Sequence, residues 1–130
     1  MSATLGEAHD DLYRSLNVML EGDAGPVLAV WSNSDDVTYG GPFGGFVSGR
    51  DAVVEAFEAS AAMVLGGSIE VSDVHMLEGA DVGYSVCIEH GNNHTIDGQP
   101  VNLVHRATNI FRKEGGSWRL VHHHTDGSAA

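Results

Sequence analysis

The chain has 130 residues, a formal net charge of −12 and a single cysteine. This length suits one compact domain over residues 1–130, and the excess of negative charge disfavours binding to phosphate backbones or acidic membrane surfaces. One cysteine cannot form an internal disulfide, and no apolar run approaches the ~20 residues of a membrane helix. The N-terminal residues lack the basic and apolar regions of a signal peptide. We therefore expect a cytoplasmic protein that binds neither nucleic acid nor membrane.

The first half of the chain has the pattern of three helices. Apolar residues recur three and four positions apart in residues 4–21, which predicts an amphipathic helix. Residues 22–32 predict a second, short helix with a proline in its first turn. A third helix is predicted over residues 49–65, with Ser48 as its cap and Asp51 completing a capping box.

A glycine-rich segment separates the second and third helices. Residues 37–41 predict a short strand, and the sequence GGPFGG follows at residues 40–45. This segment lacks the Gly-Lys-Ser/Thr of a phosphate-binding loop. We interpret it as a bulged turn that lets Phe43 and Phe46 pack.

The second half of the chain has the pattern of consecutive strands. Strands are predicted over residues 68–77, 82–90, 101–113 and 117–126. Residues 91–100 are expected to form a loop, and residues 114–116 a hairpin turn. Helices followed by antiparallel strands predict an α+β fold, with one curved sheet wrapped over the helices.

Three consecutive histidines lie near the C-terminus, in the segment WRLVHHHTDG. Because side chains alternate along a strand, we expect one face to carry Trp118, Leu120, His122, His124 and Asp126. The other face would carry His123 and Thr125. A histidine beside an aspartate is held in one tautomer and gains basicity, which suits a general base. The alternative is structural: buried histidines that hydrogen-bond across strands and anchor the sheet or a dimer.

A metal site is the other alternative for these histidines. His122 and His124 could be two ligands, and a catalytic zinc takes about three protein ligands plus water. Further ligands would have to come from Glu89, His90, His94 or His105. The spacing permits such a site but does not select it, and we expect neither a metal nor a cofactor.

Two further positions combine charge with a strand pattern. In residues 82–90 the strand alternates, so either Glu89 or His90 must face inward. A glutamate in an apolar wall would have a raised pKa and could serve as a base, whereas an exposed strand end is the structural alternative. Arg106 and Thr108 share a face of the next strand, and an arginine facing a pocket would bind a carboxylate or enolate through its planar fork.

Residues 16–58 and 106–126 resemble the SnoaL-like group of the NTF2-like superfamily, which includes ketosteroid isomerases and polyketide cyclases. The ending Trp-x-x-Val-His-x-His is also similar to that of the calcium/calmodulin-dependent kinase association domain. The resemblance implies an NTF2-like cone, with N-terminal helices packed in a curved antiparallel sheet, a pocket inside the sheet and a homodimer. Carried over to this sequence, it implies pocket positions at Trp31, Tyr39, Phe43, Arg106, Thr108, His122, His124 and Asp126.

The resemblance implies a small hydrophobic, oxygenated ligand and isomerase- or cyclase-type chemistry. We expect His124 with Asp126 to be the base pair, and Arg106 or Tyr39 to stabilise an oxyanion. The ketosteroid isomerases pair a carboxylate base with a tyrosine and a protonated aspartic acid, and this sequence offers a tyrosine but no aspartate in place of the base. The alternatives are a non-catalytic ligand-binding or dimerisation module, and a metal-dependent enzyme that uses the His-x-His pair.

Overall fold

The structure is a computed structural model that describes residues 2–127. Its helices are α1 (Leu5–Met19), α2 (Gly25–Val30) and α3 (Arg50–Ala62). Its strands are β1 (Thr38–Gly40), β2 (Phe46–Ser48), β3 (Ser68–Glu78), β4 (Val82–Ile96), β5 (Gln99–Glu114) and β6 (Ser117–Gly127). No helix in this range is long and apolar enough to cross a membrane.

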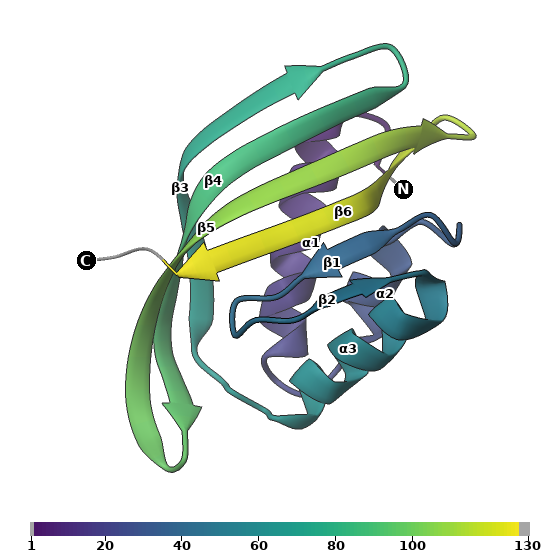
Figure 1. The fold of residues 1–130 in the computed structure, drawn as a ribbon. Coiled ribbons are helices and arrows are strands. Elements are labelled where there is room, and N and C mark those ends of the chain that lie inside the picture. Colours follow the sequence, from purple (N-terminus) through teal and green to yellow (C-terminus); the bar gives the residue numbers. More distant parts are fainter. Residues whose placement is uncertain (1, 128–130) are drawn as a thin grey trace.

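The six strands form one sheet in the order β2-β1-β6-β5-β4-β3 (Figure 1). Only β1 and β6 run parallel, and every other neighbouring pair is antiparallel. The four long strands follow one another along the chain, whereas β1 and β2 extend the sheet beyond β6. This arrangement confirms the predicted α+β fold.

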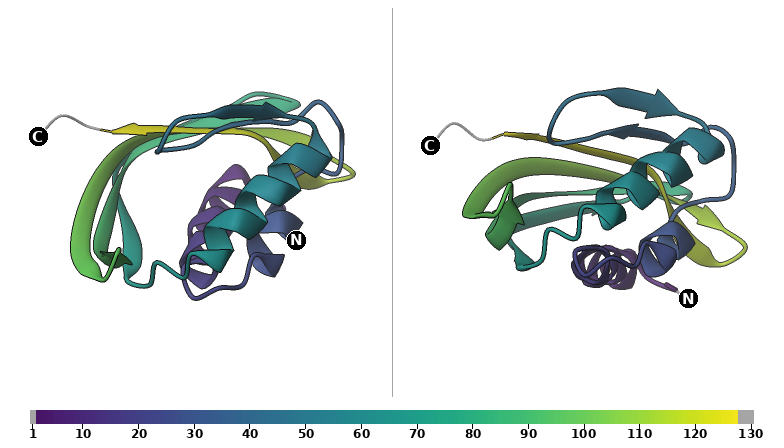
Figure 2. Two further views of the ribbon diagram at one scale, coloured as in Figure 1. Left: turned by 60° about the horizontal axis from the view of Figure 1, so that its bottom comes forward. Right: turned by 90° about the horizontal axis from the view of Figure 1, so that it is seen from below.

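The sheet bends strongly, and all three helices lie on its concave side (Figure 2). Helix α1 crosses this side and contacts β3, β4, β5 and β6. Its apolar stripe is buried as predicted, because Leu5, Leu12 and Leu16 point into the space between helix and sheet. The fold therefore has a core between helices and sheet and a convex sheet face that no helix covers.

The helix caps differ from the prediction. The capping box lies at the start of α1, where the Thr4 hydroxyl accepts from the backbone N–H of Glu7 and the Glu7 carboxylate accepts from that of Thr4. Gly49, with φ of 95°, precedes helix α3 and offers no side-chain cap, and the Asp35 carboxylate accepts from the backbone N–H of Arg50 instead. The predicted cap Ser48 is wrong because this residue pairs with Thr38 in the β1–β2 ladder.

Residues 91–100 form a hairpin rather than the predicted loop. Strand β4 continues to Ile96, and β5 begins at Gln99. Asp97 and Gly98 connect them with φ values of 51° and 76°. An Asp-Gly pair with two positive φ angles is the preferred two-residue connection between antiparallel strands, and it was the overlooked signal.

A β-bulge in β6 decides which histidine faces the helices. Ile110 pairs with His122 and the next residue of β5, Phe111, pairs with Leu120, so Val121 is an extra residue in β6. A bulge of one residue reverses the alternation of side chains beyond it. Leu120 before the bulge and His123 after it are therefore both buried on the concave side.

Candidate functional site

A cavity of about 260 Å³ lies between the concave side of the sheet and helices α1 and α3. Most of its wall is apolar, and the lining includes Leu16, Met19, Leu20, Phe57, Met63, Leu65, Ile69 and Leu103. Its polar lining side chains are Tyr39, Ser60, Glu89, His94, His105, His123 and Thr125. No lysine or arginine lines it. A mostly apolar cavity with a few convergent polar groups is the usual form of a small-molecule site.

Glu89 places a carboxyl group in this wall. The residue lies on the concave face of β4 and is only 5% exposed. Tyr13 of α1 donates a hydrogen bond of 2.8 Å from its hydroxyl to Glu89 Oε2. Burial in the apolar wall raises the pKa of Glu89 to about 7, and the hydrogen bond from Tyr13 offsets part of the rise. The carboxyl group therefore exchanges its proton close to neutral pH.

A buried hydrogen-bond network fixes the protons around this carboxyl group. The amide nitrogen of Asn109 donates to the Tyr13 hydroxyl at 3.1 Å and to the Ser85 hydroxyl at 3.2 Å. The amide oxygen of Asn109 consequently faces Nδ1 of His123. Because a carbonyl oxygen only accepts, this nitrogen of His123 must carry a proton. Neutral His123 then has its lone pair on Nε2.

His123 faces Glu89 across the small side chain of Ala107. Its Nε2 lies 4.0 Å from Glu89 Oε2. Complete burial, together with the neighbouring histidines His122 and His124, lowers the pKa of His123 to about 3. The imidazole is therefore neutral at pH 7, and its Nε2 is a second proton acceptor beside the carboxylate.

Strands β1 and β6 supply hydroxyl groups to the same cavity. The Tyr39 ring stacks on His123, with centroids 5.8 Å apart and planes 5° apart. Burial and the negative charge of Glu89 raise the pKa of Tyr39 to about 12, so its hydroxyl stays protonated at physiological pH. Thr125 follows on the same strand as His123 and also lines the cavity. The hydroxyl groups of Tyr39 and Thr125 are therefore hydrogen-bond donors in the cavity that also holds the Glu89 carboxyl group.

Three of the positions expected from the sequence line the cavity: Tyr39, Phe43 and Glu89. Phe43 lies in the glycine-rich loop and is 64% exposed, so it borders the cavity from the solvent side. Phe46 is 66% exposed as well. The expectation that this turn lets both phenylalanines pack is met only for Phe43, whose ring lies edge-on to that of His105 with centroids 6.4 Å apart.

The expected catalytic group lies on the other side of the sheet. Arg106 and Asp126 form an exposed ion pair with each other, with Nε and Oδ1 2.8 Å apart. Their convex-face neighbour His124 is exposed. The prediction that His124 and Asp126 share a face with Leu120 is wrong, because the extra residue Val121 reverses the alternation of side chains along β6.

The remaining expected positions also lie away from the cavity. Thr108 and His122 are on the convex face, where the His122 Nδ1 and the Thr38 hydroxyl are 2.7 Å apart. His90 is on the same face and lies within hydrogen-bond distance of the Ser72 hydroxyl. Trp31 is fully buried behind the cavity wall, against the rings of Tyr39 and Phe57.

The metal alternative finds little geometric support. The His122 and His124 rings are stacked with centroids 6.3 Å apart. Within residues 2–127, no group of three or more histidine, cysteine, aspartate or glutamate side chains could hold a metal ion.

The cavity and its hydrogen-bond network also contain residues outside the expected pocket positions: Tyr13, His94, His105, Asn109, His123 and Thr125. The sequence analysis named His94 and His105 only as ligands of the metal alternative. The strand alternation that placed Glu89 could have placed His105 opposite it, since these two residues pair across β4 and β5. No local signal marks the bulge that turns His123 and Thr125 inward.

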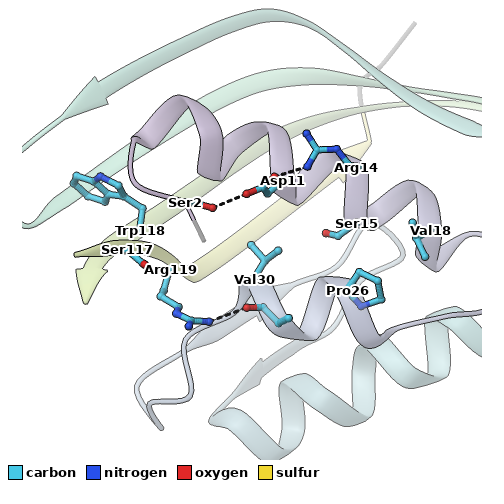
Figure 3. A pocket seen from close by; sticks show the side chains of 11 residues that line it. Ser2, Asp11, Arg14, Ser15, Val18, Pro26, Val30, Ser117, Trp118 and Arg119 are labelled. Atoms are coloured by element: carbon cyan, nitrogen blue, oxygen red, sulfur yellow. Dashed lines mark hydrogen bonds and ion pairs between the residues drawn. The ribbon is translucent and has the colours of Figure 1, made fainter. Parts of the chain in front are cut away.

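A second, more open cavity of about 410 Å³ lies on the other side of α1 (Figure 3). Its charged groups are already paired: Asp11 accepts from Ser2 and from Arg14, and Arg119 donates to the backbone oxygen of Ala29 at 2.8 Å. It holds no buried titratable group comparable to Glu89. The candidate site is therefore the cavity between sheet and helices.

Three solved structures share the fold along nearly the whole chain. A structure from Thiobacillus denitrificans, named as a calcium/calmodulin-dependent protein kinase type II association domain, is 25% identical with a TM-score of 0.82, covering 99% of this chain and 98% of that one. A structure from Streptomyces avermitilis, named as a dehydratase of the NTF2-like family, is 23% identical with a TM-score of 0.81, covering 97% and 95%. A ketosteroid isomerase-like protein from Erwinia carotovora atroseptica is 20% identical with a TM-score of 0.78, covering 98% and 96%.

The names of these structures include a kinase association domain, a dehydratase and an isomerase-like protein, so they agree on the fold and not on one function. No curated protein matches the chain. The SnoaL-like domain family matches residues 10–126, which confirms the resemblance drawn from the sequence. The chain is a member of the SnoaL-like domain family and has the fold of NTF2-like structures.

Proposed function

We propose that this protein binds a small hydrophobic ketone in the cavity and abstracts a proton from the carbon next to the carbonyl group. Glu89 is the general base. The observation that carries this proposal is the carboxyl group of Glu89, buried in an apolar wall with no cation beside it and with a pKa of about 7. A base whose pKa lies near the working pH is the most effective at proton transfer.

The proposed reaction needs only groups of this chain. The carboxylate of Glu89 takes the proton from carbon, the C–H bond electrons move into a carbon–carbon double bond, and the carbonyl electron pair moves onto oxygen. Tyr39 donates a hydrogen bond to the resulting enolate oxygen, since its hydroxyl keeps its proton. In a β,γ-unsaturated ketone, return of the proton to the γ carbon moves the double bond and gives isomerisation. In a ketone with a leaving group on the β carbon, departure of that group with its bonding electron pair re-forms the carbonyl group and gives elimination. The absence of lysine and arginine from the lining favours an uncharged ligand.

Proton abstraction can be tested without knowing the natural substrate. The probe is β-tetralone, a compact bicyclic ketone, dissolved in heavy water with the protein. Enolisation replaces its α protons by deuterons, and NMR follows the exchange. We expect the wild-type protein to accelerate exchange over buffer, and Glu89→Gln to lower the rate by about 100-fold or more.

The matched control is Glu70→Gln, which removes a carboxylate from the convex face beside His90. It should leave exchange unchanged. Exchange at the wild-type rate in Glu89→Gln would contradict the assignment of the base. Binding of β-tetralone without exchange would favour the alternative function, a non-catalytic ligand-binding protein.

We also propose that the protein is a homodimer formed through the convex face of the sheet. This face carries apolar side chains that no helix covers, among them Tyr84 at 40% and Val104 at 44% exposure. Ile110 lies on the same face, between Tyr84 of β4 and His122 of β6. An exposed apolar patch of this kind marks a protein interface. Light scattering should give twice the monomer mass, and Ile110→Lys should give the monomer mass with the fold retained; a monomeric wild type would contradict the proposal.

A further inference from the structure

Thr125 carries a hydroxyl group that the protein itself does not use. The residue lies on the concave face of β6, pairs with Ala107 of β5 and is 3% exposed. It lines the cavity. Its Oγ1 is buried and has no hydrogen-bond partner among residues 2–127.

A buried hydroxyl without a partner destabilises a fold. It loses its hydrogen bonds to water, and nothing in the folded chain replaces them. Valine has nearly the same shape, favours strands equally and would occupy this position without that cost. A polar atom retained in such a place is accounted for when a ligand satisfies it. The hydroxyl is covered in the ligand-free protein, and rotation about the Cα–Cβ bond would turn it toward a ligand in the cavity that Thr125 lines.

The surroundings of Thr125 indicate what it would bind. The carboxylate of Glu89 and Nε2 of His123 are acceptors, so this part of the cavity needs donors for a ligand oxygen. Tyr39 lies on the neighbouring strand in register with His123, and Thr125 follows two residues later. Tyr39 on β1 and Thr125 on β6 thus place two hydroxyl groups on neighbouring strands of the cavity wall, and Glu89 lies on β4, beyond β5 in the same sheet.

We infer that the Thr125 hydroxyl is a ligand-orienting donor: it donates a hydrogen bond to the carbonyl oxygen of the bound ketone and turns the adjacent C–H toward Glu89. This inference deepens the proposed function and rests on it for the identity of the ligand. It assigns the carbonyl oxygen to the β1–β6 wall and the acidic carbon to the β4 wall.

The test compares Thr125→Val, which removes only the hydroxyl, with Thr125→Ser, which keeps it. The matched contrast is Thr38→Val, because the Thr38 hydroxyl lies 2.7 Å from the His122 ring nitrogen and faces away from the cavity. Each variant is measured for its Tm without ligand, its Kd for β-tetralone, and the carbonyl stretching frequency of bound carbon-13-labelled ketone.

We expect Thr125→Val to raise the Tm of the ligand-free protein by a few degrees, since an unpartnered buried hydroxyl is removed. It should also weaken β-tetralone binding by about 10-fold and shift the carbonyl stretch to higher frequency. Thr125→Ser should keep the binding and the frequency of the wild type. Thr38→Val should lower Tm and leave both ligand readouts unchanged.

The inference is overturned if Thr125→Val binds the ketone as the wild type does, or if the carbonyl frequency does not move. It is also overturned if the wild type does not bind β-tetralone. The proposed function fails separately: a ketone that binds with a shifted carbonyl frequency but exchanges no α protons leaves Thr125 as an orienting donor and removes Glu89 as a catalytic base.

Discussion

Glu89 extends its carboxyl group into a cavity wall that contains no cation, so burial acts mainly against the charged form. Tyr13 offsets part of this effect by donating to Oε2, and Asn109 and Cys87 in turn donate to the tyrosine hydroxyl. The carboxyl group is thus held in place by neutral donors, which orient it without pairing its charge. Such an arrangement keeps a base reactive, whereas a salt bridge would lower its pKa.

The raised pKa of Glu89 has a consequence for stability. The pKa is 4.5 in the unfolded chain and about 7 in the folded protein, so between these values the folded state binds more protons. The contribution of Glu89 to stability is therefore lost as the pH rises through this window, by about 3 kcal/mol in total. Glu89→Gln should be more stable than the wild type above pH 7 in urea unfolding, and this advantage should shrink toward pH 5. A difference that does not change with pH would contradict the burial of the carboxylate.

His123 offers a spectroscopic prediction. Its contact with the amide oxygen of Asn109 requires a proton on Nδ1, and its burial lowers its pKa to about 3. We expect nitrogen-15 NMR to find His123 neutral, in the Nδ1–H tautomer, from pH 5 to pH 8. An Nε2–H tautomer, or titration of His123 near the ordinary histidine pKa of 6.5, would contradict this hydrogen-bond network.

One irregular residue, Val121, allows strand β6 to contribute to both the core and the cavity. Trp118 and Leu120 pack against the helices before the bulge, and His123 and Thr125 line the cavity after it. A regular strand would place the second pair on the convex face. The bulge at Val121 therefore lets one strand serve both the core and the site.

Val121 is the extra residue of β6, so its deletion should leave a regular strand. The pairs Phe111–Leu120 and Ile110–His122 would then follow one another directly, and the residues on either side would keep their faces. We expect the deletion variant to keep cooperative unfolding, measured by circular dichroism in urea. Deletion of Arg119 is the contrast and should abolish cooperative unfolding, because it would place the buried side chains of Trp118 and Leu120 on opposite faces. Loss of cooperative unfolding on deletion of Val121 would contradict the assignment of the bulge.

The bulge at Val121 also separates what could be predicted from the sequence from what could not. The sequence predicts the apolar stripe of α1, the long strands and their order. These features follow from periodicity, because most of the residues keep the regular alternation of a helix or a strand. Alternation required that either Glu89 or His90 face inward, but the sequence alone did not decide between them. The choice among the three histidines did not follow, since alternation fails at Val121 and nothing in the local sequence marks the bulge.

The whole molecule is strongly acidic, and so is the lining of its cavity. The chain has a formal net charge of −12, and the lining of the cavity contains a carboxyl group and no lysine or arginine. The charge of the surface and the charge of the cavity lining therefore both disfavour the binding of anions. The arginine once expected in the pocket, Arg106, is paired with Asp126 on the convex face.

This distribution of charge predicts selection against anionic ligands. Tetralin carboxylate has the same bicyclic body as β-tetralone but a negative charge, and we expect calorimetry at pH 8 to give a Kd at least about 10-fold weaker for it. Glu89→Gln should narrow this difference because it removes the nearest negative charge. Tighter binding of the carboxylate would contradict the assignment of an uncharged ligand.

The central claim is that Glu89 is a buried carboxyl group poised to lose and regain a proton near neutral pH. The most direct measurement is a carbon-13 NMR titration of the protein labelled at the glutamate side-chain carboxyl carbons, with Glu89→Gln used to assign the resonance. The account predicts that one glutamate titrates with a pKa of about 7, and that its resonance is absent from the variant. A resonance of Glu89 that titrates near 4.5, as for a carboxyl group in water, would contradict the account.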